Sequence, residues 1–339
     1  MAQAAFITGL AGRVLTADEA AFLRSARPCG LILFARNIDT PAQVRRLIAD
    51  AQDAVGARAL VLIDQEGGRV QRLRPPHWRT LPSGAMYAAR AHLDPDAAIA
   101  EARLVARLIA HDLRDVGMTC NCTPVLDVLA PDAHANIGNR ALGTTAAGVI
   151  ALGRAIAQGH LDGGVLPVIK HIPGHGRATL DTHLALPTVT TPEAELATTD
   201  FAPFKALADL PAAMTAHVVF SAIDPAGPAS TSAIVTERII RGSIGFDGLL
   251  MSDDLSMHAL SGSPRQRAAA VIAAGTDVAL HCNGQMAEMV QVAAAVPLLA
   301  GRSLERFGKA SAVSDAQAPF NMTLAEACLR RILGVAAGS

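Results

Sequence analysis

The stretch Ala59-Leu-Val-Leu-Ile-Asp64-Gln-Glu-Gly-Gly68 contains an apolar run that ends in a carboxylate and a Gly-Gly turn. The run Ala59–Asp64 is short and rich in branched residues, which is typical of a strand buried on both faces. Seven further segments have the same character: Ala5–Gly9, Gly30–Phe34, Met118–Thr123, Leu166–His171, Ala212–Val218, Leu249–Asp253 and Asp277–Cys282. The sequence therefore predicts eight buried strands.

Amphipathic stretches separate these strands. The clearest are Pro41–Val55, Pro95–Val116, Thr144–Asp162 and Pro264–Ala274, and Thr16-Ala-Asp-Glu19 has the spacing of a helix-capping box. Eight alternations of strand and helix fit either a closed parallel barrel or a doubly wound open sheet. The Gly-x-Gly-x-x-Gly signature of a dinucleotide-binding open sheet does not follow the first strand. We therefore predict an α/β fold with a single (β/α)8 TIM-type barrel.

The size and composition of the chain restrict its class. Its 339 residues suffice for one barrel, so we expect a single catalytic domain over 1–339 with a C-terminal helical extension from about residue 303, including a helix at Leu324–Val335. The formal charge of −1 argues against nucleic-acid and membrane-surface partners. The N-terminus does not resemble a signal peptide, and the five cysteines lie in apolar segments, as reduced core residues do. We expect a cytoplasmic monomer.

Polar residues close several of the expected strands. Asp64, Lys170-His171, His217, Asp253 and Asn283 stand at the ends of the third, fifth, sixth, seventh and eighth strands. Enzymes built on this barrel carry their chemistry on the carboxyl-terminal rim, supplied by different strands. The sequence therefore predicts an active site on that rim.

Two rim segments carry carboxylates. Asp64 leaves its strand with Arg72 eight residues later, and such a pair suits either paired sugar hydroxyls or a structural ion pair. In the segment Met251–Asp254, successive side chains of a regular strand would point to opposite sides. We therefore expect Asp253 or Asp254 to face the rim and the other to point toward the helices in a hydrogen-bonding role.

A third rim segment is dense in titratable groups: Lys170-His171-Ile-Pro-Gly-His175-Gly-Arg-Ala-Thr-Leu-Asp181-Thr-His183. A loop of this kind on a rigid strand is typical of a functional site. His171 and His175 have a spacing that zinc ligands use, but they lie across a Pro-Gly turn and no further ligands follow at a familiar spacing. We expect no metal and no cofactor.

These three segments resemble those of glycoside hydrolase family 3, in particular its short NagZ-type β-N-acetylglucosaminidases. The resemblance rests on KH-x-PGHG and SDDLSM and extends to Gly30–Asn37, Pro124–Asp127, Ile137–Arg140, Met214–His217 and Gly245–Gly248. Larger members carry a second α/β domain that completes the active site, and the length of this chain fits the short type. The resemblance implies an enzyme that removes terminal β-linked N-acetylglucosamine from muropeptide fragments of the cell wall.

Position by position, the resemblance implies a retaining mechanism with Asp253 as nucleophile and with His183, partnered by Asp181, as general acid/base. It also implies that the sugar is held by five residues: Asp64, Arg72, Arg140, Lys170 and His171. A histidine suits the acid/base role because its pKa near ~6.5 lets it donate a proton and then accept one. Thr182 and Arg177 depart from the family pattern, which could alter the mobility of the loop or the preferred leaving group.

Three alternatives remain open. A metal-dependent hydrolase could use His171, His175, His183 and Asp253 as ligands, and a non-catalytic barrel could bind sugar alone. Within the enzyme class, phosphate could replace water as the glycosyl acceptor. The single Trp and single Tyr, beside nine Phe, argue against a long stacking groove and favour exo-action on a small carbohydrate.

Overall fold

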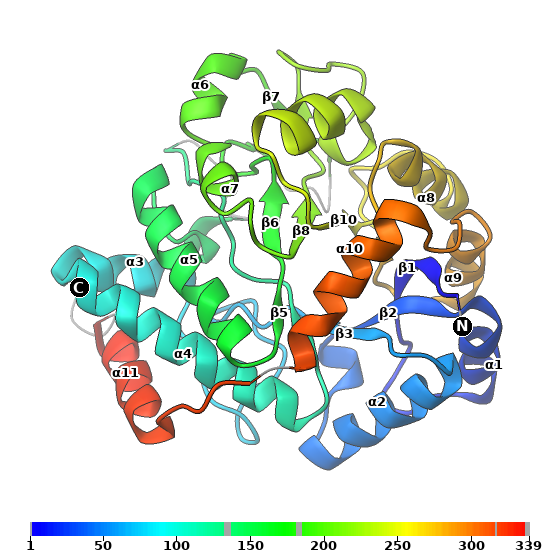
Figure 1. Cartoon of the computed structure of the whole chain (residues 1–339), viewed down its shortest axis with the longest axis horizontal. Helices are drawn as coiled ribbons and strands as arrows, with labels where there is room; N and C mark the ends of the chain where they lie inside the picture. Colours follow the sequence, from blue (N-terminus) through cyan, green and yellow to red (C-terminus); the bar gives the residue numbers. More distant parts are fainter. Residues whose placement is uncertain (1, 132–136, 181–184, 316, 336–339) are drawn as a thin grey trace.

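A computed structural model of the chain describes residues 2–131, 137–180, 185–315 and 317–335 (Figure 1). Within these residues nine strands form one sheet in the order β5-β4-β3-β2-β1-β11-β10-β8-β6, and every recorded pair is parallel. The strands are β1 (Ala4–Gly9), β2 (Pro28–Leu33), β3 (Leu60–Ile63), β4 (Cys120–Asn121), β5 (Leu166–Pro167), β6 (Ile169–Ile172), β8 (Ala212–Thr215), β10 (Leu249–Asp254) and β11 (Val278–His281).

The two ends of this sheet belong to one continuous segment of chain. Leu166 of β5 pairs with Cys120 of β4, and Ile169 of β6, three residues later, pairs with Ala213 of β8. The segment thus joins β4 to β8 and closes the sheet, so β5 and β6 together are the fifth strand expected from the sequence. The predicted (β/α)8 barrel is confirmed, and the open doubly wound sheet is excluded.

The interior of the barrel is filled by alternate residues of the strands, as strand periodicity requires. These buried residues form one cluster: Ala5, Ile7, Cys29, Ile32, Leu60, Leu62, Cys120, Cys122, Leu166, Val168, Ala212, Met214, Leu249, Met251, Val278 and Leu280. Their neighbours on the same strands, such as Val61, Ala213 and Leu250, belong to a second cluster shared with the helices. Both faces of the sheet are therefore covered, which explains why the strands are apolar throughout.

Helices surround the sheet (Figure 1). They are α1 (Ala17–Ala26), α2 (Pro41–Val55), α3 (Gly84–Leu93), α4 (Pro95–Asp115), α5 (Ala146–Asp162), α6 (Glu193–Thr198), α7 (Ala202–Ala206), the π-helix η4 (Val235–Ser243), α8 (Pro264–Ala273), α9 (Met286–Ala293), α10 (Gly301–Ala312) and α11 (Met322–Val335). Short 3-10 turns lie at Ala35–Asn37, Gly138–Arg140, Ala229–Thr231 and Val313–Asp315. The capping box expected at Thr16 is present and begins α1.

The two C-terminal helices, α10 and α11, pack against different parts of the barrel. Phe307 and Ala310 of α10 belong to the cluster that fills the barrel, so α10 packs directly against the interior residues. Figure 1 shows α10 crossing in front of the strands. The last helix, α11, packs against α3 and α4 and includes the expected helix at Leu324–Val335. A two-stranded parallel pair, β7 (Thr188–Val189) and β9 (Val219–Phe220), was not expected from the sequence. None of the described helices is long and apolar enough to cross a membrane.

Candidate active site

A cavity of about 310 Å³ lies at the carboxyl ends of the strands. Ile32, Met214 and Leu280, from the interior of the barrel, contribute to its lining. Five residues that follow an interior residue by two positions extend the same inward face: Phe34, Asp64, Lys170, Asp253 and Cys282. Strand alternation therefore directs these five side chains into one space, although they come from five different parts of the sequence.

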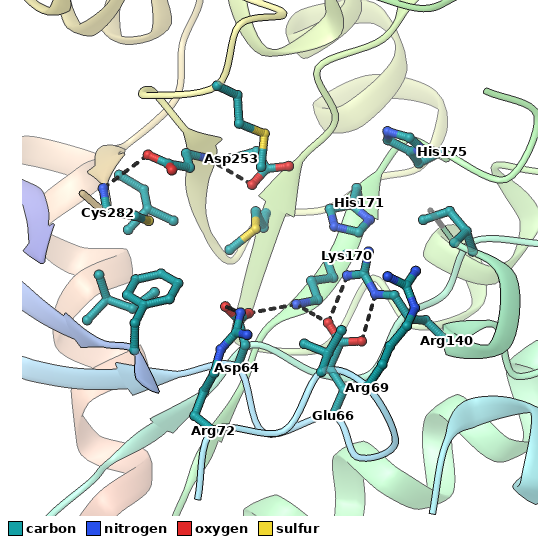
Figure 2. Close-up of a pocket in the computed structure, with 18 residues that line it drawn as sticks. Asp64, Glu66, Arg69, Arg72, Arg140, Lys170, His171, His175, Asp253 and Cys282 are labelled. Carbon is teal, nitrogen blue, oxygen red and sulfur yellow. Dashed lines mark hydrogen bonds and ion pairs between the residues drawn. The ribbon is translucent and has the colours of Figure 1, made fainter. Parts of the chain in front are cut away.

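Charged residues on one side of the cavity form a continuous network (Figure 2). Lys170 lies between two carboxylates, with Nζ 2.9 Å from Asp64 Oδ1 and 2.6 Å from Glu66 Oε1. Arg140 grips Glu66 with two nitrogens, each 2.8 Å from a carboxylate oxygen. Arg72 donates to the remaining oxygen of Asp64 at 3.2 Å. Three cations are thus held in place by two carboxylates.

The network fixes the charges of its members. Burial opposes ionisation of Asp64, but Lys170 and Arg72 hold the pKa of its carboxyl well below the usual range. Burial acts against Glu66 too, and Arg140 and Lys170 lower its pKa to about 2. Burial would lower the pKa of Lys170, yet the two carboxylates raise it. All these groups are therefore charged at neutral pH.

Asp253 lies near the end of β10 and is 7% exposed. Burial would raise the pKa of its carboxyl, but His171 and His217 bring it below the usual value. The backbone N–H of Asp254 also donates to Asp253 Oδ1 at 2.8 Å. The cavity thus contains an ionised carboxylate in a largely water-excluded position, which is a suitable nucleophile or stabiliser of positive charge.

His171 is oriented by Asp127, a carboxylate that is fully buried behind it. Asp127 Oδ2 is 2.6 Å from His171 Nδ1, and Oδ1 accepts the backbone N–H groups of His171 and His175 at 3.1 and 2.7 Å. Burial opposes ionisation of Asp127, but His171 lowers its pKa to about 2. Because an ionised carboxylate only accepts, Nδ1 of His171 carries the proton and Nε2 is left for another partner.

Two buried polar atoms of the cavity lining make no hydrogen bond within the described parts of the chain: Arg72 Nε and His175 Nδ1. Burial lowers the pKa of His175 to about 4, so its ring is neutral. Buried polar atoms are rarely left unpaired in proteins, which indicates that a polar ligand or water completes them.

Asp254 partly contradicts the expectation based on strand alternation. Its carboxylate accepts from the backbone N–H groups of Ser256 and Cys282 at 2.9 and 3.0 Å, which confirms a structural hydrogen-bonding role. However, Asp254 does not simply point away into the helical layer, because it also borders the cavity. The reason is a shift in the pairing of β10 with β11 between Met251 and Asp254, which breaks the regular alternation.

The cavity brings together the sugar-binding residues expected from the sequence. Its lining consists of Ile32, Phe34, Asp64, Glu66, Arg69, Val70, Arg72, Ile137, Arg140, Lys170, His171, His175, Met214, Asp253, Asp254, Met257, Leu280 and Cys282. All five expected binding residues and Asp253 are in this set, whereas Asp181 and His183 lie outside the described residues. His217 and Asn283, two of the polar strand ends, are not part of the lining; His217 instead contacts Ser230 and the Asp254 carbonyl.

Sequence reasoning missed Glu66 and Asp127. Glu66 could have been found, since it follows Asp64 by two residues and alternation places both on one face. Asp127 gave no comparable signal, because its contact with His171 spans 44 positions. The metal-dependent alternative requires a cluster of ligands, and the residues that the structure describes contain no group of three or more His, Cys, Asp or Glu side chains able to hold a metal ion.

Fold and cavity together define a barrel enzyme with an ionised carboxylate in a small polar pocket. Residues 8–305 match the family described as the Glycosyl hydrolase family 3 N terminal domain. A beta-hexosaminidase from Alkalilimnicola ehrlichii is 40% identical over 280 residues, which cover 81% of this chain and 79% of the relative. A beta-hexosaminidase from Pseudomonas aeruginosa is 39% identical over 295 residues, or 86% of each chain.

Solved structures give the same result. NagZ from Neisseria gonorrhoeae, in complex with N-trifluoroacetyl-D-glucosamine, matches with a TM-score of 0.87 and 29% identity over 99% of both chains. A family 3 beta-N-acetylglucosaminidase from Paenibacillus sp. matches with a TM-score of 0.84 and 31% identity, over 98% of this chain and 67% of that one. The chain belongs to glycoside hydrolase family 3. The resemblance to the NagZ type is confirmed, and the protein is a glycoside hydrolase.

Proposed function

We propose that this enzyme is a retaining, exo-acting β-N-acetylglucosaminidase that releases terminal β-linked N-acetylglucosamine from muropeptides in cell-wall recycling. The observation that carries the proposal is the ionised Asp253 in a cavity that also contains a network of ion-paired polar residues. A cavity of about 310 Å³ is at the small end of ligand pockets and suits one sugar ring. The relatives named above as beta-hexosaminidases support the choice of sugar.

The proposed mechanism has two steps. An Asp253 oxygen bonds to the anomeric carbon as the glycosidic bond breaks, and His183 gives its proton to the departing oxygen. Water then attacks the same carbon, returns a proton to His183 and releases Asp253, so the configuration is retained. Asp181 would orient the imidazole of His183 and stabilise its charged form. The roles of Asp181 and His183 rest on the sequence resemblance alone.

Substrate binding is proposed for Asp64, Arg72, Arg140, Lys170 and His171. Asp64 pairs with Arg72 and Lys170. Glu66 holds Arg140, and Asp127 holds His171, so all five have fixed positions. Arg72 Nε still has no hydrogen-bond partner among the described residues. Charged groups make stronger hydrogen bonds to hydroxyls than neutral groups do, so a pre-arranged set can bind a neutral sugar.

The two C-terminal helices pack on the barrel, which supports one catalytic domain. We also propose that the enzyme is a monomer and that it acts in the cytoplasm.

A panel of nitrophenyl β-glycosides that differ at the 2-position tests the substrate. We expect turnover of the 2-acetamido sugar and much poorer turnover of the glucoside, because a site that pairs with a substrate group can reject an analogue without it by up to ~10⁴-fold. Comparable rates would contradict the proposal. Adding phosphate to the assay and looking for glucosaminyl phosphate distinguishes hydrolysis from transfer to phosphate.

A further inference from the structure

We propose that Glu66 is a positioning residue that orients both Lys170 and Arg140 and keeps the site selective for an uncharged sugar. The inference rests on the proposed function, because it concerns the same cavity and the same sugar. It adds a residue whose carboxylate holds two of the binding cations at once and balances their charge.

The local backbone directs Glu66 into the cavity. Asp64 and Glu66 share a face, while Gln65 between them is turned away and accepts the backbone N–H groups of Arg72 and Leu73 at 2.9 and 3.0 Å. Gly67 follows with φ +103°, and a Cβ there would lie 2.0 Å from the Pro82 carbonyl oxygen. Only glycine permits this turn, so the backbone that carries Glu66 has little freedom.

The carboxylate of Glu66 contacts two cations, Lys170 and Arg140, at the same time. Its side chain is 6% exposed, and Oε1 lies 2.6 Å from Lys170 Nζ and 2.8 Å from Arg140 Nη2, while Oε2 lies 2.8 Å from Arg140 Nε (Figure 2). A planar carboxylate that meets the guanidinium with both oxygens fixes its plane as well as its position. The same group also holds the ammonium of Lys170 opposite Asp64. One side chain therefore sets the relative placement of two cations from different elements.

The charge of Glu66 also balances the cavity. Four basic residues line it, namely Arg69, Arg72, Arg140 and Lys170, against four carboxylates, namely Asp64, Glu66, Asp253 and Asp254. Without the Glu66 charge the lining would carry an excess positive charge in a partly water-excluded space. Such a space attracts anions, because electrostatic interactions there are much stronger than in bulk water. Glu66 thus favours a neutral sugar over an anion such as phosphate.

Two variants separate the geometric role from the charge. Glu66→Gln keeps the size of the side chain and removes its charge, whereas Glu66→Asp keeps the charge and shortens the reach. With nitrophenyl β-N-acetylglucosaminide, we expect KM to rise about tenfold or more in both, since a hydrogen bond to a charged group is lost or lengthened, with a smaller change in kcat. We expect inhibition by inorganic phosphate at a lower concentration than in wild type in Glu66→Gln only.

Glu101 offers a matched control. It is a buried carboxylate of α4 that pairs with Arg90 through both oxygens, at 2.8 and 3.2 Å, and it is not among the residues that line the cavity. Glu101→Gln should lower thermal stability without changing KM or the response to phosphate. Should Glu66→Gln fail to fold, a normal KM in Glu66→Asp would overturn the proposal. An unchanged KM in folded Glu66→Gln, or a fall confined to kcat, would overturn it too. Failure of the wild type to hydrolyse the glycoside would instead contradict the proposed function.

Discussion

Asp253 combines two properties that a glycosidase nucleophile needs, burial and ionisation. His171 and His217 lower the pKa of the Asp253 carboxyl, so the group stays ionised at pH values at which an ordinary Asp is protonated. Its protonation should therefore limit activity only at acidic pH. We predict that a slow fluorosugar substrate labels Asp253 in a peptide map. Asp253→Asn should lower kcat by ~10³-fold or more, as removal of a nucleophile typically does. A label on Asp254, or a product of inverted configuration, would show that the nucleophile is wrongly assigned.

Asp127 determines which nitrogen of His171 faces the cavity. In the wild type, the two carboxylate oxygens of Asp127 accept three N–H groups. Asp127→Asn keeps the shape of the side chain but leaves only one oxygen to accept them. We predict a rise in KM of about tenfold, because His171 is then free to adopt the other tautomer or to rotate. Steady-state assays at constant pH would measure it. Asp277→Asn is the control, since Asp277 is similarly buried but pairs with Arg241 and Arg306; a similar KM change there would point to a general loss of packing.

At the scale of elements, the segment after β6 connects the proposed sugar-binding residues Lys170 and His171 to the proposed acid/base. Its described part is anchored by Arg177, whose guanidinium lies 2.7 Å from Asp200 and 2.9 Å from Glu195. Arg177 therefore attaches this loop to the chain around α6. A Cβ at Gly176 would lie 1.8 Å from the Val128 carbonyl oxygen, so the loop passes close to the preceding one.

We predict that His183→Ala affects substrates according to their leaving groups. A nitrophenyl group departs with little help, so its glycosylation step should slow modestly. A sugar leaving group needs a proton, and the loss there should approach the ~10²–10⁴ typical of general acid catalysis. Asp181→Ala should give the same pattern in weaker form. Equal losses on all substrates, measured by single-turnover kinetics in a folded variant, would exclude His183 as the acid.

The elements differ in how well the sequence predicts them. All eight barrel strands were predicted, because each has its own apolar run, and α2 (Pro41–Val55) has the expected bounds because Thr40 and Gly56 cap it. β7 and β9 are two residues each and too short to show a pattern. The shift near Asp254 was unpredictable for a different reason, since it depends on how β10 pairs with β11. Local pattern predicts elements, whereas pairing and long-range contacts such as Asp127–His171 require the fold.

At the scale of the whole molecule, the site is connected to a buried histidine in the helical layer. His160 of α5 is fully buried, with Nδ1 2.9 Å from the Ile156 carbonyl and Nε2 2.9 Å from Asn121 Nδ2. Asn121 in turn accepts the Gln65 N–H and donates to the Gln65 carbonyl. Since Nδ1 donates to a carbonyl and Nε2 accepts from an amide, only the neutral imidazole fits. His160 thus supports the segment that carries Asp64 and Glu66.

This arrangement predicts acid sensitivity of the fold. Burial lowers the pKa of His160 from 6.5 to about 4. Above pH 6.5 the histidine is neutral in both the folded and the unfolded chain, so its full contribution to stability is present there. Between pH 6.5 and about 4 the unfolded chain binds the proton more readily, and stability is lost as pH falls. A change from 6.5 to about 4 corresponds to ~3 kcal/mol in the free energy of unfolding.

Urea unfolding at pH 7.5 and pH 4.5 measures this loss. Wild type should lose stability between the two pH values, and His160→Gln, which cannot titrate, should lose ~2–3 kcal/mol less over the same interval, although it starts from a lower stability at pH 7.5. His92→Gln is the control, because His92 is exposed on α3 and its replacement should leave the pH dependence unchanged. Equal losses in wild type and His160→Gln would show that His160 is not the group that makes the fold sensitive to acid.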